Sequence, residues 1–296
     1  MIVLLSLYIV DTKAYTRLNP ELHHFFSADV ALGYASLLNN SEQVENGSGV
    51  AAHIGVGYRV LYNRFLLATG AELYYMYNAY SMGVAMLNLK MVDTEADPFT
   101  LHVDATAGRD WVSALNLNIP LFVGMEYRRF YFLAGPKLCI NIANQMQAQA
   151  TAITTATYDK YIEDFEDMPN HMLGQYDLSS GNQRAPWNID VMAHVEIGGR
   201  IGSFSFDKGG DIVHPKHRIY LAAYMDYGLL NLNQVTVGAA RIGYEQQSGQ
   251  ALRLYLTPAL MSKDIVGAWV RQLSVGIKAT VLLELPKRDK CVMCEL

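Results

Sequence analysis

The stretch WVRQLSVGIKATVLLEL, residues 269–285, decides the fold class. Every second residue from Trp269 onward is apolar except Arg271, whereas the residues between them are mostly polar or small and include Lys278 and Glu284. A helix turns about 100° per residue and would scatter these two sets around its surface, but a strand sorts them onto two faces. The stretch therefore predicts a β-strand with one apolar face and one polar face.

The same alternation recurs along the rest of the chain. It covers residues 25–38, 49–60, 65–80, 111–126, 130–143, 187–203 and 218–230. The expected connections are tight turns near 61–64 and 127–129, intermediate links at 39–48 and 206–217, and long loops over 81–110, 144–186 and 231–267. Short turns at one end and long loops at the other are typical of membrane barrels. We therefore expect an all-β fold, a transmembrane antiparallel up-and-down β-barrel of eight strands with short periplasmic turns and long extracellular loops.

A barrel of ten strands is the alternative. Residues 234–244 and 251–260 also look extended and could add one hairpin to the ring. Pro258 disfavours a central strand, because proline cannot donate a ladder hydrogen bond. We therefore expect eight strands in the ring, with this pair projecting beyond the membrane.

The polar faces of the strands carry charges of both signs, whereas the apolar faces are broad, branched and nearly free of charge. This distribution favours lipid outside and a polar interior. The expected interior residues are Asp29, His53, Arg59, Glu72, Glu126, Lys137, His194, Glu196, Arg200, Asp226 and Lys278. An eight-stranded interior is just wide enough for packed side chains, so we interpret the set as a structural network. Acid/base chemistry or an ion path through His53, His194, Glu196 and Asp226 is the alternative.

Aromatic residues provide a second indication of lipid contact. Trp111, Trp187 and Trp269 each lie near the expected start of a strand, after a long loop, and in its apolar set. Tyr127 and Phe130 flank a short turn and would supply the belt at the opposite rim. Membrane interfaces favour such rings, because one part is apolar and the other needs a polar partner.

Composition limits the function classes. Only 17% of the residues are charged, against roughly 25% in typical soluble domains. The net charge of −5 with no basic patch argues against a nucleic-acid partner. The sequence contains no run of about 18 apolar residues, so it predicts no transmembrane helix. Residues 1–14 resemble a signal peptide without the usual positive start, with a buried first strand as the alternative, and residues 15–285 form the predicted barrel.

The tail at residues 286–296 contains Cys291 and Cys294 as C-x-x-C. Such a pair can be a redox centre or half of a metal site, but zinc needs about four ligands and no second pair occurs. A disulfide or an unspecialised periplasmic tail is the simpler interpretation, and no cofactor is expected. The acidic segment 158–171 could bind calcium, but its spacing does not match an EF-hand and predicts a solvated loop.

The chain resembles the small outer-membrane β-barrel proteins of Bacteroidota, of the PorT-like type. The stretches that carry the resemblance are LNIPLFVGMEYRRFYFLAGPKLCINI (117–142), YLAAYMDYGLLNLN (220–233) and SVGIKATVLLELP (274–286), and the resemblance extends from about Phe25 to Pro286. It implies an eight-stranded barrel in the outer membrane with both termini in the periplasm. PorT itself is associated with type IX secretion, but the family offers no catalytic motif to carry over.

We therefore expect a non-enzymatic outer-membrane barrel in contact with lipid. Its loops or its tail would bind other envelope or secretion proteins, and the oligomeric state is left open. A narrow channel or ligand-binding barrel is one alternative, and a lipid-modifying enzyme is another. No G-x-S-x-G, phosphate-binding loop or H-E-x-x-H motif is present in the sequence.

Overall fold

The computed structural model describes residues 22–93, 96–158, 164–165, 173–204, 217–245 and 252–285. The expected signal peptide at 1–14, the tail with Cys291 and Cys294, and most of the acidic segment 158–171 lie outside these ranges. No helix within the described ranges combines the length and the apolar character that crossing a bilayer requires.

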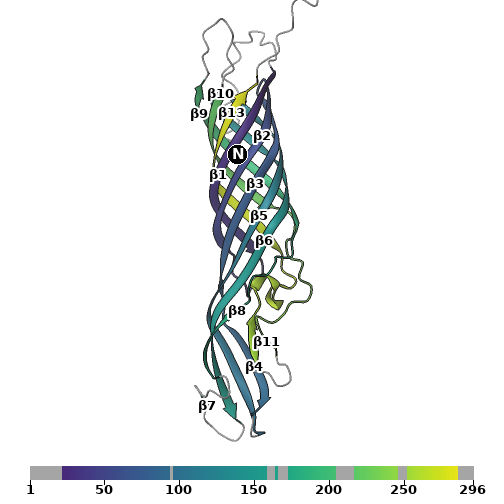
Figure 1. Cartoon of the computed structure of the whole chain (residues 1–296). Helices are drawn as coiled ribbons and strands as arrows, with labels where there is room; N and C mark the ends of the chain where they lie inside the picture. The colour runs from purple at the N-terminus through teal and green to yellow at the C-terminus, as the bar shows by residue number, and fades with distance from the viewer. Residues whose placement is uncertain are drawn as a thin grey trace, which may run out of the picture.

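Eight antiparallel strands close into a ring, which confirms the predicted all-β up-and-down barrel (Figure 1). The strands of the ring, in order, are β1 (Leu22–Asn39), β2 (Ser48–Tyr62), β3 (Phe65–Met82), β5 (Pro98–Tyr127), β6 (Phe130–Tyr158), β9 (Ile189–Phe204), β10 (His217–Gly228) and β13 (Val270–Glu284). Each strand pairs with the next one in this order, and β13 pairs with β1 from Asn39↔Val270 to Phe25↔Glu284. Alternating side chains give all eight strands one face toward the interior.

One end of the barrel carries the tight turns that the sequence predicts. Two-residue turns join β2 to β3 and β5 to β6, and their first residues, Asn63 and Arg128, have φ of 56° and 59°. The described chain also starts and stops here, because Leu22 pairs with Tyr62 beside the β2–β3 turn and the Leu285 N–H donates to the His24 carbonyl at 2.8 Å. We call this the short-turn end.

The opposite end differs from the prediction of long loops. The first residues of β5 and the last residues of β6 run beyond the ring as paired arms, joined by β4 (Ala85–Val92), β7 (Asp164–Phe165) and β8 (Gly174–Ser179). Residues 98–109 and 149–158 with β4, β7 and β8 are here called the extension (Figure 1). The loop expectation was wrong for residues 85–92, 98–110, 144–158 and 174–179, because alternating residues there bury one face in a second apolar core. This core includes Leu101, Val103, Ala150 and Ala152.

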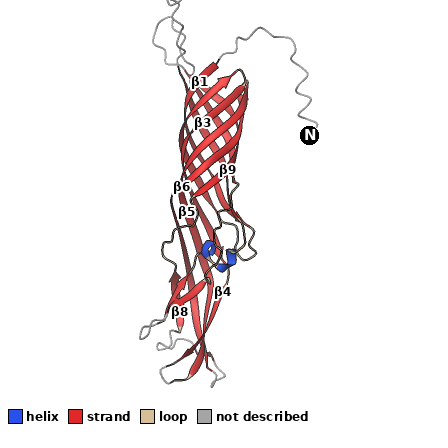
Figure 2. Ribbon diagram, turned by 90° about the vertical axis from the view of Figure 1, so that its right-hand side faces the viewer, coloured by secondary structure: helices blue, strands red, loops and turns tan. Residues whose placement is uncertain are grey.

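A separate hairpin covers that second core. β11 (Ile242–Glu245) and β12 (Arg253–Leu256) form a two-stranded sheet outside the ring, which confirms eight strands over ten. Ile242 and Leu256 pack against the extension. Two short 3-10 helices follow, η3 (Ala259–Met261) and η4 (Lys263–Ile265), at the mouth of the barrel (Figure 2). Pro258 precedes η3 and belongs to no strand, as its missing N–H requires.

The barrel interior is layered along its axis. An apolar cluster that includes Phe25, Phe122 and Tyr131 fills the short-turn end. A belt of charged side chains follows at mid-height. A second apolar cluster at the mouth joins the ring to η3 and η4, with Leu260 and Ile265 buried in it. The described lumen is therefore filled from both ends.

The outer face of the ring is apolar and exposed. Leu32, Ile54 and Ile277 lie near the middle of their strands with 67%, 64% and 61% of their surface exposed. Soluble sheets put such residues inward and polar ones toward water. This barrel is inverted, with charges buried and branched aliphatic side chains outside.

Candidate functional site

The central feature of the interior is Lys278 on β13. Its Nζ lies 3.4 Å from Asp29 Oδ1, 3.2 Å from Glu72 Oε1 and 3.3 Å from Glu196 Oε2. These carboxylates come from β1, β3 and β9, so one ammonium links three other strands. Gly55 on β2 provides the space for these side chains, since a Cβ there would lie 2.9 Å from both Asp29 Oδ1 and Glu72 Cγ.

Lys137 on β6 forms a second node of the same network. Its Nζ lies 2.9 Å from Glu72 Oε2 and 3.1 Å from Asp226 Oδ2. Asp226 also accepts a hydrogen bond from His194 Nδ1 at 2.5 Å, and His194 Nε2 lies 3.3 Å from Glu196 Oε2. The His194 ring therefore lies between the carboxylates of Asp226 and Glu196.

Glu196 connects the two nodes to a third cation. Arg59 Nη2 lies 3.9 Å from Glu196 Oε1, and the Tyr131 hydroxyl donates to the same oxygen. Three fixed cations (Arg59, Lys137 and Lys278) thus face four carboxylates (Asp29, Glu72, Glu196 and Asp226). The rings of His53 and His194 lie among them.

The network is enclosed within the lumen. Its side chains are almost completely buried, and apolar clusters close the lumen above and below them. Asp29, His53 and Glu72 offer ligand atoms within 4.8 Å of one another, a donor set that a divalent cation could use. The Lys278 ammonium already lies beside both carboxylates, so a lysine takes the place of a metal ion there.

Two predicted interior residues lie apart from this network, at the short-turn end. Glu126 accepts hydrogen bonds from Arg218 Nη1 at 3.1 Å and from the Tyr220 hydroxyl at 3.0 Å. Arg200 is half-buried and follows the last fully inward position of β9. Strand parity could have found Arg218, Tyr220 and Tyr131, since all three share the inward face of their strands.

A separate polar clamp fixes residues 252–268, here called the mouth segment, to the barrel. Asp110 Oδ2 on β5 accepts from Arg241 Nη1 at 2.8 Å and from the Ala259 N–H at 2.5 Å. Arg241 Nη1 also donates to the Thr257 carbonyl at 2.7 Å. Parity places Asp110 inward, but Arg241 precedes β11 in a region without readable alternation, so sequence reasoning missed the pair.

The aromatic belt is only partly as expected. Tyr127 and Phe130 are exposed at the short-turn end, and Trp111 and Trp269 are half-buried. Trp187 is 5% exposed and packs in the mouth cluster, so its placement on the outer face was wrong. β9 begins two residues later at Ile189, so strand parity does not apply to Trp187. Trp111 also lies inside β5 rather than near its start, because β5 begins at Pro98.

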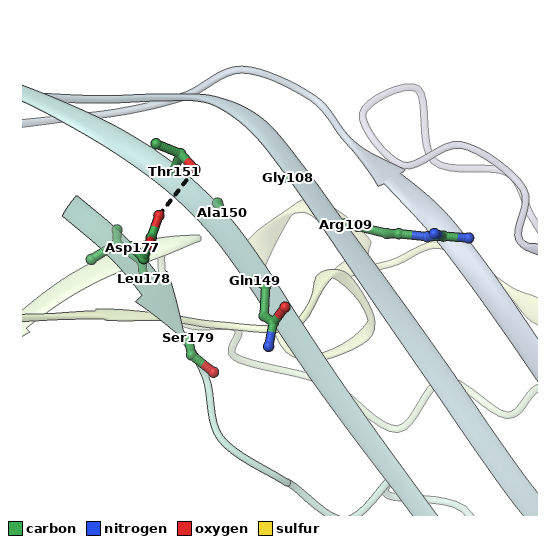
Figure 3. A pocket seen from close by; sticks show the side chains of 8 residues that line it. All are labelled: Gly108, Arg109, Gln149, Ala150, Thr151, Asp177, Leu178 and Ser179. Atoms are coloured by element: carbon green, nitrogen blue, oxygen red, sulfur yellow. Dashed lines mark hydrogen bonds between the residues drawn. The ribbon is translucent and has the colours of Figure 1, made fainter. Parts of the chain in front are cut away.

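A surface hollow lies on the extension (Figure 3). It has a volume of about 560 Å³, is wide open, and is bordered by β5, β6 and β8. Its polar lining includes Arg109, Gln149, Asp177 and Ser179, and Asp177 Oδ1 accepts from the Thr151 hydroxyl at 3.2 Å. Such a surface can exchange hydrogen bonds with a partner but encloses no small molecule.

Within the described residues, Cys139 on β6 is a free cysteine, and its side chain is buried. No family model matches the chain, and no curated protein matches its sequence.

Proposed function

We propose that this chain is a non-enzymatic outer-membrane β-barrel that holds the extension above the membrane as a binding surface for other envelope proteins. The inverted barrel carries this proposal. Burying a charged network while exposing Leu32, Ile54 and Ile277 is unfavourable in water but favourable in hydrocarbon. The resemblance to PorT-like barrels of Bacteroidota supports the same location.

The filled lumen favours an anchor over a channel. Arg59 and Glu196 meet across the ring, and both ends of the lumen are occupied by apolar clusters. We place the barrel so that the short turns and the termini lie in the periplasm and the extension lies outside the cell. The resemblance to PorT suggests a more specific form of this proposal, in which the protein is an accessory subunit in secretion or envelope assembly.

The extension is the part that fits a partner. It has its own apolar core, and its other face presents Thr, Gln, Asn and His side chains in ordered pairs. His102 Nδ1 lies 2.8 Å from Asn88 Oδ1, and His102 Nε2 lies 3.0 Å from Thr157 Oγ1. A rigid polar sheet face of this kind preorganises hydrogen-bonding groups, which lowers the entropy lost on binding.

The test combines location with partner capture. Outer-membrane fractionation and heat-modifiable migration on gels should identify a membrane barrel, and protease added to intact cells should cut the extension but not the short turns. A photo-cross-linker at Gln149 should then capture envelope proteins, whereas one at Ile277, within the apolar band, should not. A water-soluble barrel, or a cross-linker at Gln149 that captures nothing, would contradict the proposal.

A further inference from the structure

Arginines gather at the short-turn end, although the whole chain is acidic with a net charge of −5. The five are Arg64, Arg128, Arg129, Arg200 and Arg218. The described carboxylates at this end are already engaged, since Glu126 pairs with Arg218 at 3.1 Å and Glu284 with His23 at 2.6 Å. Within the described chain, neither Arg129 nor Arg200 has a carboxylate within ion-pair distance, so their charge is available to an external anion.

The strand pairing builds a hollow between these arginines. β6 begins at Phe130 opposite Gly199, so the last residues of β9 continue past the β5–β6 turn and pair only with β10. A bulge at Ile201 interrupts that pairing, and bulges redirect neighbouring side chains. The Arg200 N–H donates to the Arg129 carbonyl at 2.6 Å, which holds the turn against the bulge.

This hollow has a volume of about 300 Å³. Its lining residues are Arg129, Arg200, Ile201, Gly202, Ser203 and Arg218. The lining therefore brings together three arginines and one serine, and of these Arg218 is already paired with Glu126. Guanidinium groups bind phosphate oxygens in a bidentate manner, and hydroxyls donate to the same oxygens.

Aromatic residues set the height of the hollow relative to a bilayer. Tyr127 is exposed, and the Arg64 and Arg128 guanidinium carbons lie 4.8 Å and 5.3 Å from its ring centroid. Phe65 and Phe130 are exposed on the same rim. Aromatic rings of this kind lie at the level of the headgroups, so the arginines directly beyond them lie where lipid phosphates are found.

We propose that the hollow between Arg129, Arg200 and Arg218 binds the phosphate of an anionic glycerophospholipid in the leaflet at the short-turn end. This inference rests on the proposed membrane placement of the barrel. Ser203 donates a further hydrogen bond to the same phosphate, and Arg64 and Arg128 extend the attraction to neighbouring headgroups.

The experiment uses the full chain reconstituted in two kinds of lipid nanodisc, phosphatidylcholine alone and phosphatidylcholine mixed with phosphatidylglycerol. Native mass spectrometry then measures which lipids stay bound when the protein is released. The double variant R129Q/R200Q removes two guanidinium groups that make no described ion pair. Each surface arginine contributes about 1 kcal/mol to anionic lipid attraction, so phosphatidylglycerol should bind about 30-fold more weakly to the double variant.

Arg109→Gln is the matched control, because Arg109 is an exposed arginine of the extension. It should retain the affinity of the unmodified protein. Equal retention of both lipids, or an unchanged affinity in the double variant, would overturn the inference. Displacement of phosphatidylglycerol by inorganic phosphate would identify a site for free phosphate and would overturn it as well.

Measuring whether the barrel inserts into the nanodiscs distinguishes a failure of this inference from a failure of the proposed function. If the barrel fails to insert into either nanodisc, the membrane placement fails and the lipid site fails with it. If the barrel inserts into both but shows no preference for the anionic lipid, only the lipid site is overturned.

Discussion

Arg59 on β2 and Glu196 on β9 lie on opposite sides of an eight-stranded ring, yet Arg59 Nη2 and Glu196 Oε1 are only 3.9 Å apart. Three strands separate them in either direction around the ring. A contact between diametrically opposed strands leaves no continuous aqueous path at that height. The ring itself is closed by the backbone pairing of β13 with β1, and this ion pair adds a link between two strands that share no backbone hydrogen bonds.

The substitution Lys278→Met should destabilise the barrel strongly. It removes the ammonium shared by Asp29, Glu72 and Glu196 and leaves buried carboxylates uncompensated. Breaking a buried ion pair from one side costs roughly 3–5 kcal/mol. Urea titration in detergent micelles, followed by the heat-modifiable shift on gels, would measure the change in unfolding free energy.

Lys90→Met is the control for that measurement, since Lys90 is exposed on β4 of the extension. It should change the unfolding free energy by about 0.5 kcal/mol or less. A loss below about 1 kcal/mol for Lys278→Met would mean that the network does not stabilise the barrel.

An arginine at Ile277 tests the lipid contact of the outer face. Ile277 lies at the middle of β13 with its side chain outward, where a charge should cost about 2–4 kcal/mol in a bilayer. Ile153 is similarly exposed but lies on the extension, so Ile153→Arg should cost about 0.5 kcal/mol or less. Folding into lipid vesicles at a series of urea concentrations would compare the two. Equal costs would argue against a membrane around the ring.

Arg241→Met should release the mouth segment while leaving the ring intact. The change removes the pair with Asp110 and the bond to the Thr257 carbonyl, and Asp110 stays buried without its cation. A local cost of about 3 kcal/mol corresponds to amide exchange roughly 100-fold faster in residues 252–268. Hydrogen exchange with mass spectrometry would follow this segment and β1 in one experiment.

Arg253→Met provides the comparison, because Arg253 is exposed on β12. Exchange in residues 252–268 should be unchanged in that variant. Faster exchange across the whole ring in Arg241→Met would show that the clamp supports the barrel itself rather than the mouth alone.

Gly55→Ala should weaken the charged belt through crowding alone. The added Cβ would lie 2.9 Å from Asp29 Oδ1 and from Glu72 Cγ, and overpacking of this kind costs about 1–3 kcal/mol. At Gly199 the nearest atom to an added Cβ is 3.6 Å away, so Gly199→Ala should cost about 0.5 kcal/mol or less. The same urea titration would compare them, and equal costs would contradict the packing argument.

Period-two alternation was enough to predict the ring and most of its interior. It placed Glu72, Lys137 and Lys278 on the inward face, because strand parity fixes side-chain direction once one face is known. It could not show which of these residues pair. That information depends on the stagger between strands, such as Glu72↔Asn118 and Lys278↔Ala31, and a sequence does not display the register of distant strands.

The same rule failed where the barrel meets the extension. Residues 98–110 and 144–158 were read as loops because alanine, threonine and glutamine give weak contrast between faces. Their strand structure follows from pairing with each other and from the cover supplied by β11 and β12, which are about 90–150 residues further along the chain. Trp187 was misplaced for a related reason, since it precedes its strand and packs with the mouth cluster.

β5 and β6 pass from the ring into the extension without a break in chain direction, as paired strands of 30 and 29 residues. A hinge needs a few unpaired residues to absorb rotation, and this junction has only a bulge between Ala105 and Ala107. At about 3.3 Å per residue, the arms hold the tip roughly 30 Å beyond the ring. The extension is therefore held at a fixed height and angle relative to the ring, and the proposed partner would have to approach it in the orientation that the barrel sets.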